Sequence, residues 1–86
     1  MPAGRSPSTP PWRILASTAL RAVRYDPGTR TLRVLFTNGS LYEYLDVPPD
    51  VVGGLLDPGG GSHGRYFQAE IRDRYEFHEL RRDLGP

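Results

Sequence analysis

Apolar and polar residues alternate along three segments in the first half of the chain, with the two-residue period of a β-strand. In the middle segment, Leu32, Val34 and Phe36 fall on one face. The stretch Asp26-Pro27-Gly28-Thr29 carries the proline and glycine of a tight turn. The pattern therefore predicts a three-stranded antiparallel meander, formed by residues 18–25, 31–36 and 41–47.

The hairpin between the second and third segments has two candidate registers. Asn38-Gly39 is typical of a two-residue hairpin loop. That loop would place Glu43 opposite Val34, so a carboxylate would enter the apolar face at a cost in free energy. A three-residue loop that includes Thr37, with Gly39 in a bulge, shifts the pairing by one residue and moves Glu43 to the opposite face. We predict this second register.

The second register distributes the side chains over the two faces. Phe36 pairs with Ser40, and Arg33 lies opposite Glu43 as a favourable cross-strand charge pair. Two tyrosines of the third strand then join the apolar face, whereas three leucines fall on the other face and form a candidate protein interface. The tyrosines are Tyr42 and Tyr44, and the leucines are Leu35, Leu41 and Leu45.

Two short helices are predicted in the second half of the chain. Pro48-Pro49 stop the third strand, and the second proline suits the first turn of a helix that runs to about Asp57. Ser62 is a suitable N-cap for a second helix over residues 64–73. The fold class is therefore α+β: a three-stranded antiparallel meander followed by two short helices on one face, with a short fourth strand as a candidate at residues 75–80. The apolar positions of the two helices are Val51, Val52, Leu55, Leu56, Phe67 and Ile71.

The composition predicts one domain with flexible ends. A chain of 86 residues is long enough for a single core. We expect a disordered proline-rich arm over residues 1–15, a folded domain over residues 16–81 and a disordered C-terminus over residues 82–86. Within the arm, Trp12, Ile14 and Leu15 are candidate anchors onto the domain. Because the chain has no cysteine, disulfides and thiolate metal sites are excluded. No segment resembles a signal peptide or a membrane span. These features favour a cytoplasmic protein without a membrane partner.

Every cation of the chain is an arginine, and the net charge is +1. The first half is the more basic one, because Asp26 is the only acid among residues 1–40. Arg21, Arg24 and Arg33 are therefore candidates for phosphate contacts in a nucleic acid. The alternative is an ordinary solvated surface.

Residues 65–75 mix guanidinium and aromatic side chains, a combination that proteins use to contact single-stranded RNA. The alternative is that the tyrosines cover the core while the arginines pair with nearby acids. The start of the second helix is a further candidate, for anion binding, because helix N-termini present free amide donors. The RNA candidates are Arg65, Tyr66, Arg72, Arg74 and Tyr75, and the anion candidates are Ser62, Gly64 and Arg65.

No catalytic site, cofactor or small-molecule substrate is predicted. Ser62-His63 are neighbours in sequence, and no acid is placed to orient them as nucleophile and base. His78 lies near Glu76 and Glu79, but without a recognised metal-ligand spacing. We therefore expect a chain that is not an enzyme and holds no metal.

The order of these elements resembles the KTSC domain, which occurs at the C-terminus of some lysyl-tRNA synthetases and as short stand-alone bacterial proteins. The resemblance covers about residues 17–80 and implies a small α+β domain. It implies no established activity, and RNA binding follows only from the synthetase context. This chain departs from the family in carrying His63 where a lysine is common and in a longer glycine-rich linker. The residues that carry the resemblance are Ser17, Tyr25-Asp26, Leu32, Val34, Phe36, Gly39, Tyr42-Glu43-Tyr44, Val47-Pro48, Leu55, Ser62, Gly64-Arg65-Tyr66-Phe67, Ile71 and Arg74-Tyr75.

Two functional hypotheses follow from the sequence. The first is a non-catalytic accessory domain that binds RNA weakly through the arginines and tyrosines named above. The alternative is a protein-interaction module, or a homo-oligomer, that uses the leucine-bearing face of the sheet.

Overall fold

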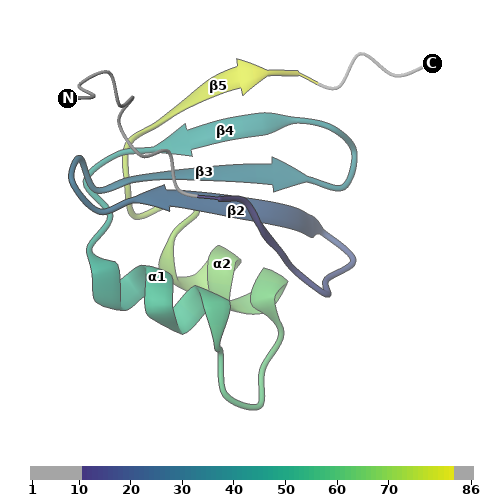
Figure 1. The fold of residues 1–86 in the computed structure, drawn as a ribbon. Coiled ribbons are helices and arrows are strands. Elements are labelled where there is room, and N and C mark those ends of the chain that lie inside the picture. Colours follow the sequence, from purple (N-terminus) through teal and green to yellow (C-terminus); the bar gives the residue numbers. More distant parts are fainter. Residues whose placement is uncertain (1–10, 83–86) are drawn as a thin grey trace, which may run out of the picture.

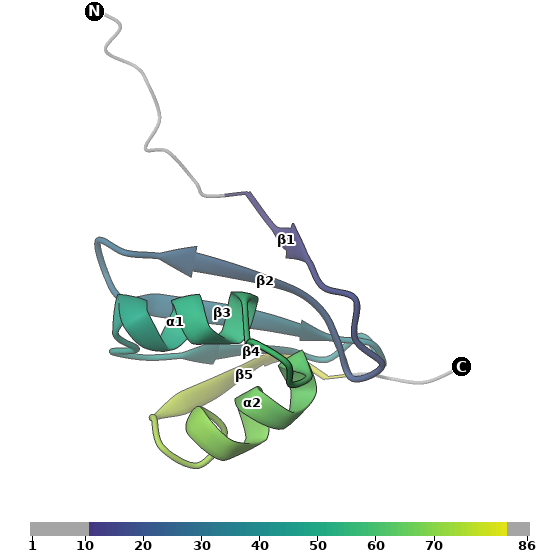
Figure 2. The ribbon, with the colours of Figure 1, turned by 90° about the horizontal axis from the view of Figure 1, so that it is seen from below.

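The computed structural model describes residues 11–82. These residues form one antiparallel sheet in the order β1-β2-β3-β4-β5, with both helices against the same face (Figure 1). Figure 2 shows the sheet from the side that the helices cover. The α+β class and the placement of the helices on one face are therefore confirmed. The elements are β1 (Arg13–Ile14), β2 (Leu20–Asp26), β3 (Thr31–Phe36), β4 (Leu41–Tyr44), α1 (Pro49–Leu56), α2 (His63–Glu70) and β5 (Phe77–Arg81).

The ordered domain begins earlier than the sequence predicts. Residues 11–15 were assigned to a disordered arm, but Arg13 and Ile14 form β1 opposite Val23 and Ala22 of β2. The Leu15 amide also donates to the Arg21 carbonyl at 3.0 Å. The free edge of β2 offers backbone partners that composition alone does not reveal. The expected arm over residues 1–10 and the last expected tail residues, 83–86, lie outside the described residues.

The fourth strand that the sequence offered as a candidate is present as β5, at one edge of the sheet. The third strand, in contrast, ends at Tyr44 rather than at residue 47. Asp46 has a φ of 57°, a left-handed conformation that interrupts an extended strand. Val47 is nevertheless fully buried. Two hydrogen bonds hold its backbone in place: its amide donates to the Arg30 carbonyl at 2.8 Å, and its carbonyl accepts from Tyr25 Oη at 2.6 Å.

The predicted hairpin register is confirmed. Arg33 lies opposite Glu43, and their side chains form an ion pair at 3.5 Å. The Phe36 amide donates to the Ser40 carbonyl at 2.9 Å across the three-residue loop. Gly39 has a φ of 96°, a conformation that other residues adopt only with strain. The bulge at this glycine is what turns Glu43 away from the apolar face.

The two helices begin where the sequence predicts. Pro49 occupies the first turn of α1, and the Ser62 hydroxyl caps α2 by accepting from the Arg65 amide at 3.0 Å. Helix α2 ends at Glu70 rather than at residue 73. The helices approach closely at Gly54, because a Cβ there would collide with the Tyr66 ring.

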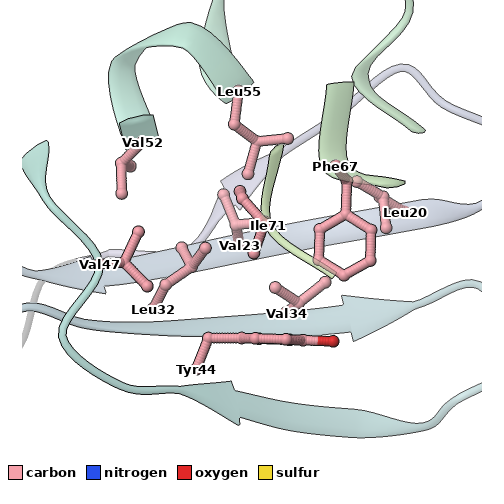
Figure 3. Close-up of a cluster of buried hydrophobic side chains, with 10 residues drawn as sticks. All are labelled: Leu20, Val23, Leu32, Val34, Tyr44, Val47, Val52, Leu55, Phe67 and Ile71. Atoms are coloured by element: carbon pink, nitrogen blue, oxygen red, sulfur yellow. The ribbon is translucent and has the colours of Figure 1, made fainter. Parts of the chain in front are cut away.

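The core lies between the two helices and the face of the sheet that they cover, which we call the inner face. Figure 3 shows Val52 and Leu55 of α1 and Phe67 of α2 pointing toward the strands. Each large aliphatic side chain buried here contributes about 1.5–3 kcal/mol through removal from water. The ten core residues are Leu20, Val23, Leu32, Val34, Tyr44, Val47, Val52, Leu55, Phe67 and Ile71.

The opposite face of the sheet, which we call the outer face, carries the alternate residues of the same strands. Leu35 lies opposite Leu41 there, as the register predicts. Both leucines are half-buried rather than fully exposed, and Leu45 lies beyond the end of β4. The prominent exposed apolar residue of this face is Ile14, at 77% exposure. Within residues 11–82, neither helix is long and apolar enough to cross a membrane.

Candidate functional site

A groove of about 560 Å³ lies between α2 and the inner face of β3, β4 and β5. It forms where the helices stop covering the sheet, so the core continues into open aromatic surface. We call it the aromatic groove. Its apolar lining is Ala19, Leu20, Phe36, Tyr42, Tyr44, Gly64, Phe67 and Phe77, and its polar lining is Thr37, Asn38, Ser40, Gln68, Arg72 and Asp73.

Five aromatic rings form a continuous cluster on the floor of this groove. Phe67 of α2 makes edge-to-face contacts with Phe36 and Tyr44 of the sheet, with ring centroids 5.6 and 5.5 Å apart. Tyr42 and Tyr44 lie nearly parallel, with centroids 6.4 Å apart. Phe77 packs against both tyrosines at 5.6 and 5.4 Å. These contacts hold the rings in fixed orientations, since each ring touches at least two others.

Burial within the cluster is graded. Tyr44 and Phe67 are each only 3% exposed and belong to the core, whereas Phe77 is 48% exposed. Tyr42 is half-buried, and its hydroxyl lies 3.5 Å from Glu79 Oε2. The groove is therefore lined by a half-buried Tyr42 and a more exposed Phe77, both packed on a buried aromatic base.

Burial raises the pKa of Tyr44 to about 12. Tyr42 and the Asp73 carboxylate act in the same direction, while the Arg72 guanidinium opposes them. Tyr44 is thus a neutral phenol at physiological pH, and the floor of the groove carries no negative charge from it.

The turn after α2 places one cation and one anion at the rim of the groove. The amides of Ile71 and Arg72 both donate to the Phe67 carbonyl, at 3.0 and 2.9 Å, which closes the helix tightly. Arg72 and Asp73 follow at once and line the groove. Among the ion pairs between described residues, none involves Arg72. Its guanidinium is therefore available to a ligand.

The structure separates the arginines that the first half of the sequence offered for phosphate binding. Arg24 and Arg33 lie directly opposite each other on β2 and β3, on the outer face. Arg21 is exposed at an irregularity in the pairing of β2 with β3. These arginines are on the opposite side of the sheet from the groove, or at its border.

The candidate RNA-binding residues between positions 65 and 75 also lie in different places. Tyr66 packs against the core, and its hydroxyl donates to the Val51 carbonyl at 3.0 Å. Tyr75 packs against the core as well, while Arg74 Nε donates to the Ala69 carbonyl at 3.1 Å. Arg65 is exposed on the first turn of α2. Of this set, Arg72 alone lines the groove.

The candidate anion site at the start of α2 is partly occupied by the protein itself. The Ser62 hydroxyl already accepts from the Arg65 amide. A Cβ on Gly64 would lie 3.7 Å from Ala19 Cβ, so the segment before β2 packs close to this helix turn. Arg65 remains exposed beside it.

The two histidines have different environments. His63 Nδ1 lies 2.7 Å from the Leu55 carbonyl and so ties α2 to the end of α1. His78 Nε2 lies 3.9 Å from Glu76 Oε2 on the surface. Across residues 11–82, no three His, Asp or Glu side chains come together as a candidate metal site.

The sequence did not identify Phe77 as a site residue. The alternation of residues 75–80 held the necessary signal, because a strand paired with residues 41–44 would bring Phe77 opposite Tyr44, as it does. The predicted register places Tyr42 and Tyr44 on the apolar face, and both lie there. Tyr44 is buried in the core, whereas Tyr42 is half-buried and lines the groove.

Comparison with known proteins places these features in a family. The sequence model of the KTSC domain matches residues 16–75. An uncharacterised protein of Stutzerimonas stutzeri (strain A1501) is 41% identical over 71% of this chain and 83% of its own length. A lysine–tRNA ligase of Nostoc sp. (strain PCC 7120) is 38% identical over 71% of this chain, but the matched region is only 10% of the ligase. The crystal structure of a KTSC domain protein from Yersinia pestis superposes with a TM-score of 0.71 at 25% identity, covering 81% of this chain and 96% of that one.

Proposed function

Because this chain belongs to the KTSC domain family, we propose that it is a non-catalytic accessory domain that binds single-stranded RNA weakly in the aromatic groove. The observation that carries the proposal is the pair of accessible rings, Tyr42 and Phe77, held on a buried aromatic base beside Arg72. Unstacked bases of single-stranded RNA bind to such rings, with about 1–3 kcal/mol per stacked base.

The size and lining of the groove fit one or two nucleotides. Its volume of about 560 Å³ lies within the range of pockets that enclose small ligands. Gln68 and Asn38 place amide groups at its edge, and an amide both donates to and accepts from the edge of a base. Arg72 supplies the one rim cation without an ion pair among the described residues, and it suits a phosphate oxygen.

The relatives add a biological context. Three cyanobacterial relatives of this chain are lysine–tRNA ligases, and in each the matched region is about a tenth of the enzyme. A region of that size attached to an enzyme that acts on tRNA fits an accessory RNA contact better than a share in the ligase reaction. This context is the reason for proposing RNA as the ligand. In those relatives, the ligase reaction would belong to the rest of the enzyme, about nine tenths of its length.

Stacking rather than charge would dominate this contact. Arg72 and Asp73 nearly balance each other at the rim, and Arg24 and Arg33 lie on the opposite face of the sheet. With about one phosphate contact, the logarithm of the affinity should fall with the logarithm of the salt concentration with a slope of about −0.7. A steep dependence would indicate contacts that the groove does not provide.

The test is fluorescence anisotropy with a labelled single-stranded RNA of mixed sequence at low ionic strength. Phe77→Ala and Tyr42→Ala should each weaken binding about 5- to 150-fold, the equivalent of one lost stacking contact. Phe77→Trp should retain binding, because it preserves a ring face.

Two matched controls locate the site. His78→Ala changes the next residue of β5, on the outer face, and should leave RNA binding unchanged. Arg24→Glu should also leave it unchanged, because Arg24 is on the outer face. Absence of RNA binding by the wild-type chain, or equal losses for Arg24→Glu and Phe77→Ala, would refute the proposal.

A further inference from the structure

The outer face carries a strip of apolar side chains that crosses four strands. Ile14 lies opposite Ala22, Ala22 opposite Leu35, and Leu35 opposite Leu41. Directly opposed residues share a face, so these four side chains form one contiguous row, about 14 Å long at the usual strand spacing. Ala22 is buried, while Ile14 is 77% exposed. We call this row the apolar strip.

A row of charged residues runs beside the apolar strip. Arg24 lies opposite Arg33, and Arg33 lies opposite Glu43. The Arg33–Glu43 ion pair at 3.5 Å neutralises one of the two cations. The Arg24 guanidinium instead sits 4.9 Å from the centre of the Trp12 ring and makes no ion pair within the described residues.

Two arginines directly opposite each other repel, and such like-charge pairs destabilise a sheet. A carboxylate placed between Arg24 and the strip would relieve this repulsion. The outer face therefore combines an apolar row with two arginines that make no ion pair among residues 11–82: Arg24 beside the strip and Arg81 opposite Leu41. Both helices lie on the other side of the sheet, so neither helix covers this row (Figures 1 and 2).

Charge decides between the possible occupants of the apolar strip. A second copy of the chain would bring the same surplus of cations, because the two rows hold Arg24, Arg33 and Arg81 against the single acid Glu43. The N-terminal residues 1–10 contain Arg5 and no acid, so they carry the wrong sign as well. The complementary surface is apolar with flanking carboxylates.

The secondary structure of the occupant also follows from the position of the strip. A sheet face offers side chains but no free backbone groups, so an extended peptide lying on it would leave its own amides unpaired. A helix satisfies its backbone internally. Its apolar residues at i, i+3 and i+7 span about 10 Å, close to the length of the strip. We infer that the outer face binds an amphipathic helix of a partner protein, with leucine-like residues along its contact stripe and Asp or Glu beside it.

The test uses three labelled helical peptides of about 18 residues, five turns each. The first has leucines at i, i+3, i+4 and i+7 with flanking glutamates. The second has lysines in place of the glutamates, and the third has the first composition in scrambled order. The inference expects anisotropy to rise with the first peptide alone.

Variants of the chain locate the contact. Arg24→Glu and Leu35→Ser should each weaken binding of the acidic peptide about tenfold or more. Arg65→Glu makes the same change in net charge on α2, on the other side of the sheet, and should leave binding unchanged. Phe77→Ala, in the aromatic groove, should also leave it unchanged. Thermal melting checks that each variant folds, and Leu41→Ser replaces Leu35→Ser if that variant does not.

Several outcomes overturn the inference. Binding of the scrambled or the basic peptide as tightly as the acidic one, or no binding of the acidic peptide, would contradict it. If Arg65→Glu weakened binding as much as Arg24→Glu, the peptide would be responding to the net charge of the chain and not to the outer face. A dimer in sedimentation that Leu35→Ser dissociates would make the occupant a second copy. Loss of RNA binding, rather than peptide binding, in Arg24→Glu would make this face a nucleic-acid surface.

Discussion

The two faces of the sheet are built from alternate residues of the same strands, yet they differ completely in environment. In β3, Leu32 and Val34 are fully buried, while Arg33 and Leu35, which alternate with them, retain contact with solvent. The difference arises because the two helices have only eight residues each and cover one face. One face of the sheet therefore holds the buried core, and the other remains partly open to solvent.

The inner face itself is not covered to its end. The helices cover the aliphatic side chains of β2 and β3 and also Tyr44 of β4, but they leave Tyr42 and Phe77 partly exposed. The aromatic groove is the place where the packed core meets solvent, so its deeper rings are held rigidly while Phe77 and Tyr42 remain accessible. Under the proposed function, stability and RNA binding share one aromatic cluster.

The largest expected difference between the two faces is in the free energy of unfolding that is lost when a leucine is truncated. Leu32→Ala should lower the free energy of unfolding by about 2–5 kcal/mol, because it opens a cavity under the helices. Leu41→Ala removes the same atoms from the half-buried outer face and should cost less than about 1 kcal/mol. Urea denaturation of both variants measures the difference. Equal losses would mean that the outer face is packed as tightly as the inner one.

The second effect is a loss of stability at alkaline pH that originates on the inner face. Tyr44 has a pKa of about 12 in the folded chain against 10.0 when unperturbed. The folded state therefore holds its proton more tightly than the unfolded state. The resulting stability is complete below about pH 10 and is lost as the pH rises toward 12, by about 2–3 kcal/mol in all.

The composition makes this titration easy to isolate. The chain has neither lysine nor cysteine, and arginine stays protonated in this range, so the side chains that titrate there are tyrosines. Urea denaturation between about pH 9 and 11.5 measures the slope. Tyr44→Phe should reduce the slope, because it keeps the ring and removes the ionisable hydroxyl; a smaller slope should remain, because burial also raises the pKa of Tyr25 and of Tyr66. An unchanged slope in Tyr44→Phe would assign the effect to the other tyrosines.

The smallest effect belongs to the outer face. The Arg33–Glu43 pair joins side chains that are 37% and 22% exposed. A double-mutant cycle with Arg33→Ala and Glu43→Ala should give a coupling energy of about 0.2–1 kcal/mol, and added salt should reduce it. A larger coupling that salt does not change would show that this face is shielded from water.

The order of the elements and the hairpin register could be predicted from local signals. Gly39 and the position of Glu43 together exclude the alternative register, because only one arrangement keeps the carboxylate out of the apolar face. Ser62 and Pro49 likewise mark the helix starts by their own hydrogen-bonding and backbone properties. Strand β1 could not be predicted, since a two-residue strand has no periodicity and depends on the free edge of β2.

The aromatic groove depends on tertiary contacts in the same way. Phe36, Tyr42, Phe67 and Phe77 come from four separate elements. Strand alternation indicates which of the strand residues share a face, but the meeting of these rings with Phe67 of α2 depends on how the helix packs on the sheet. The arginines show the reverse, because their sequence clusters suggested a common surface that the fold divides between the two faces.

The sequence by itself determined the alternation of each strand, the turn at Gly39 and the caps of the helices, because these depend on neighbouring residues. The tertiary structure alone decided which surfaces remain open. That outcome depends on how far two short helices reach across a five-stranded sheet, which is a property of the packed chain and of no single segment.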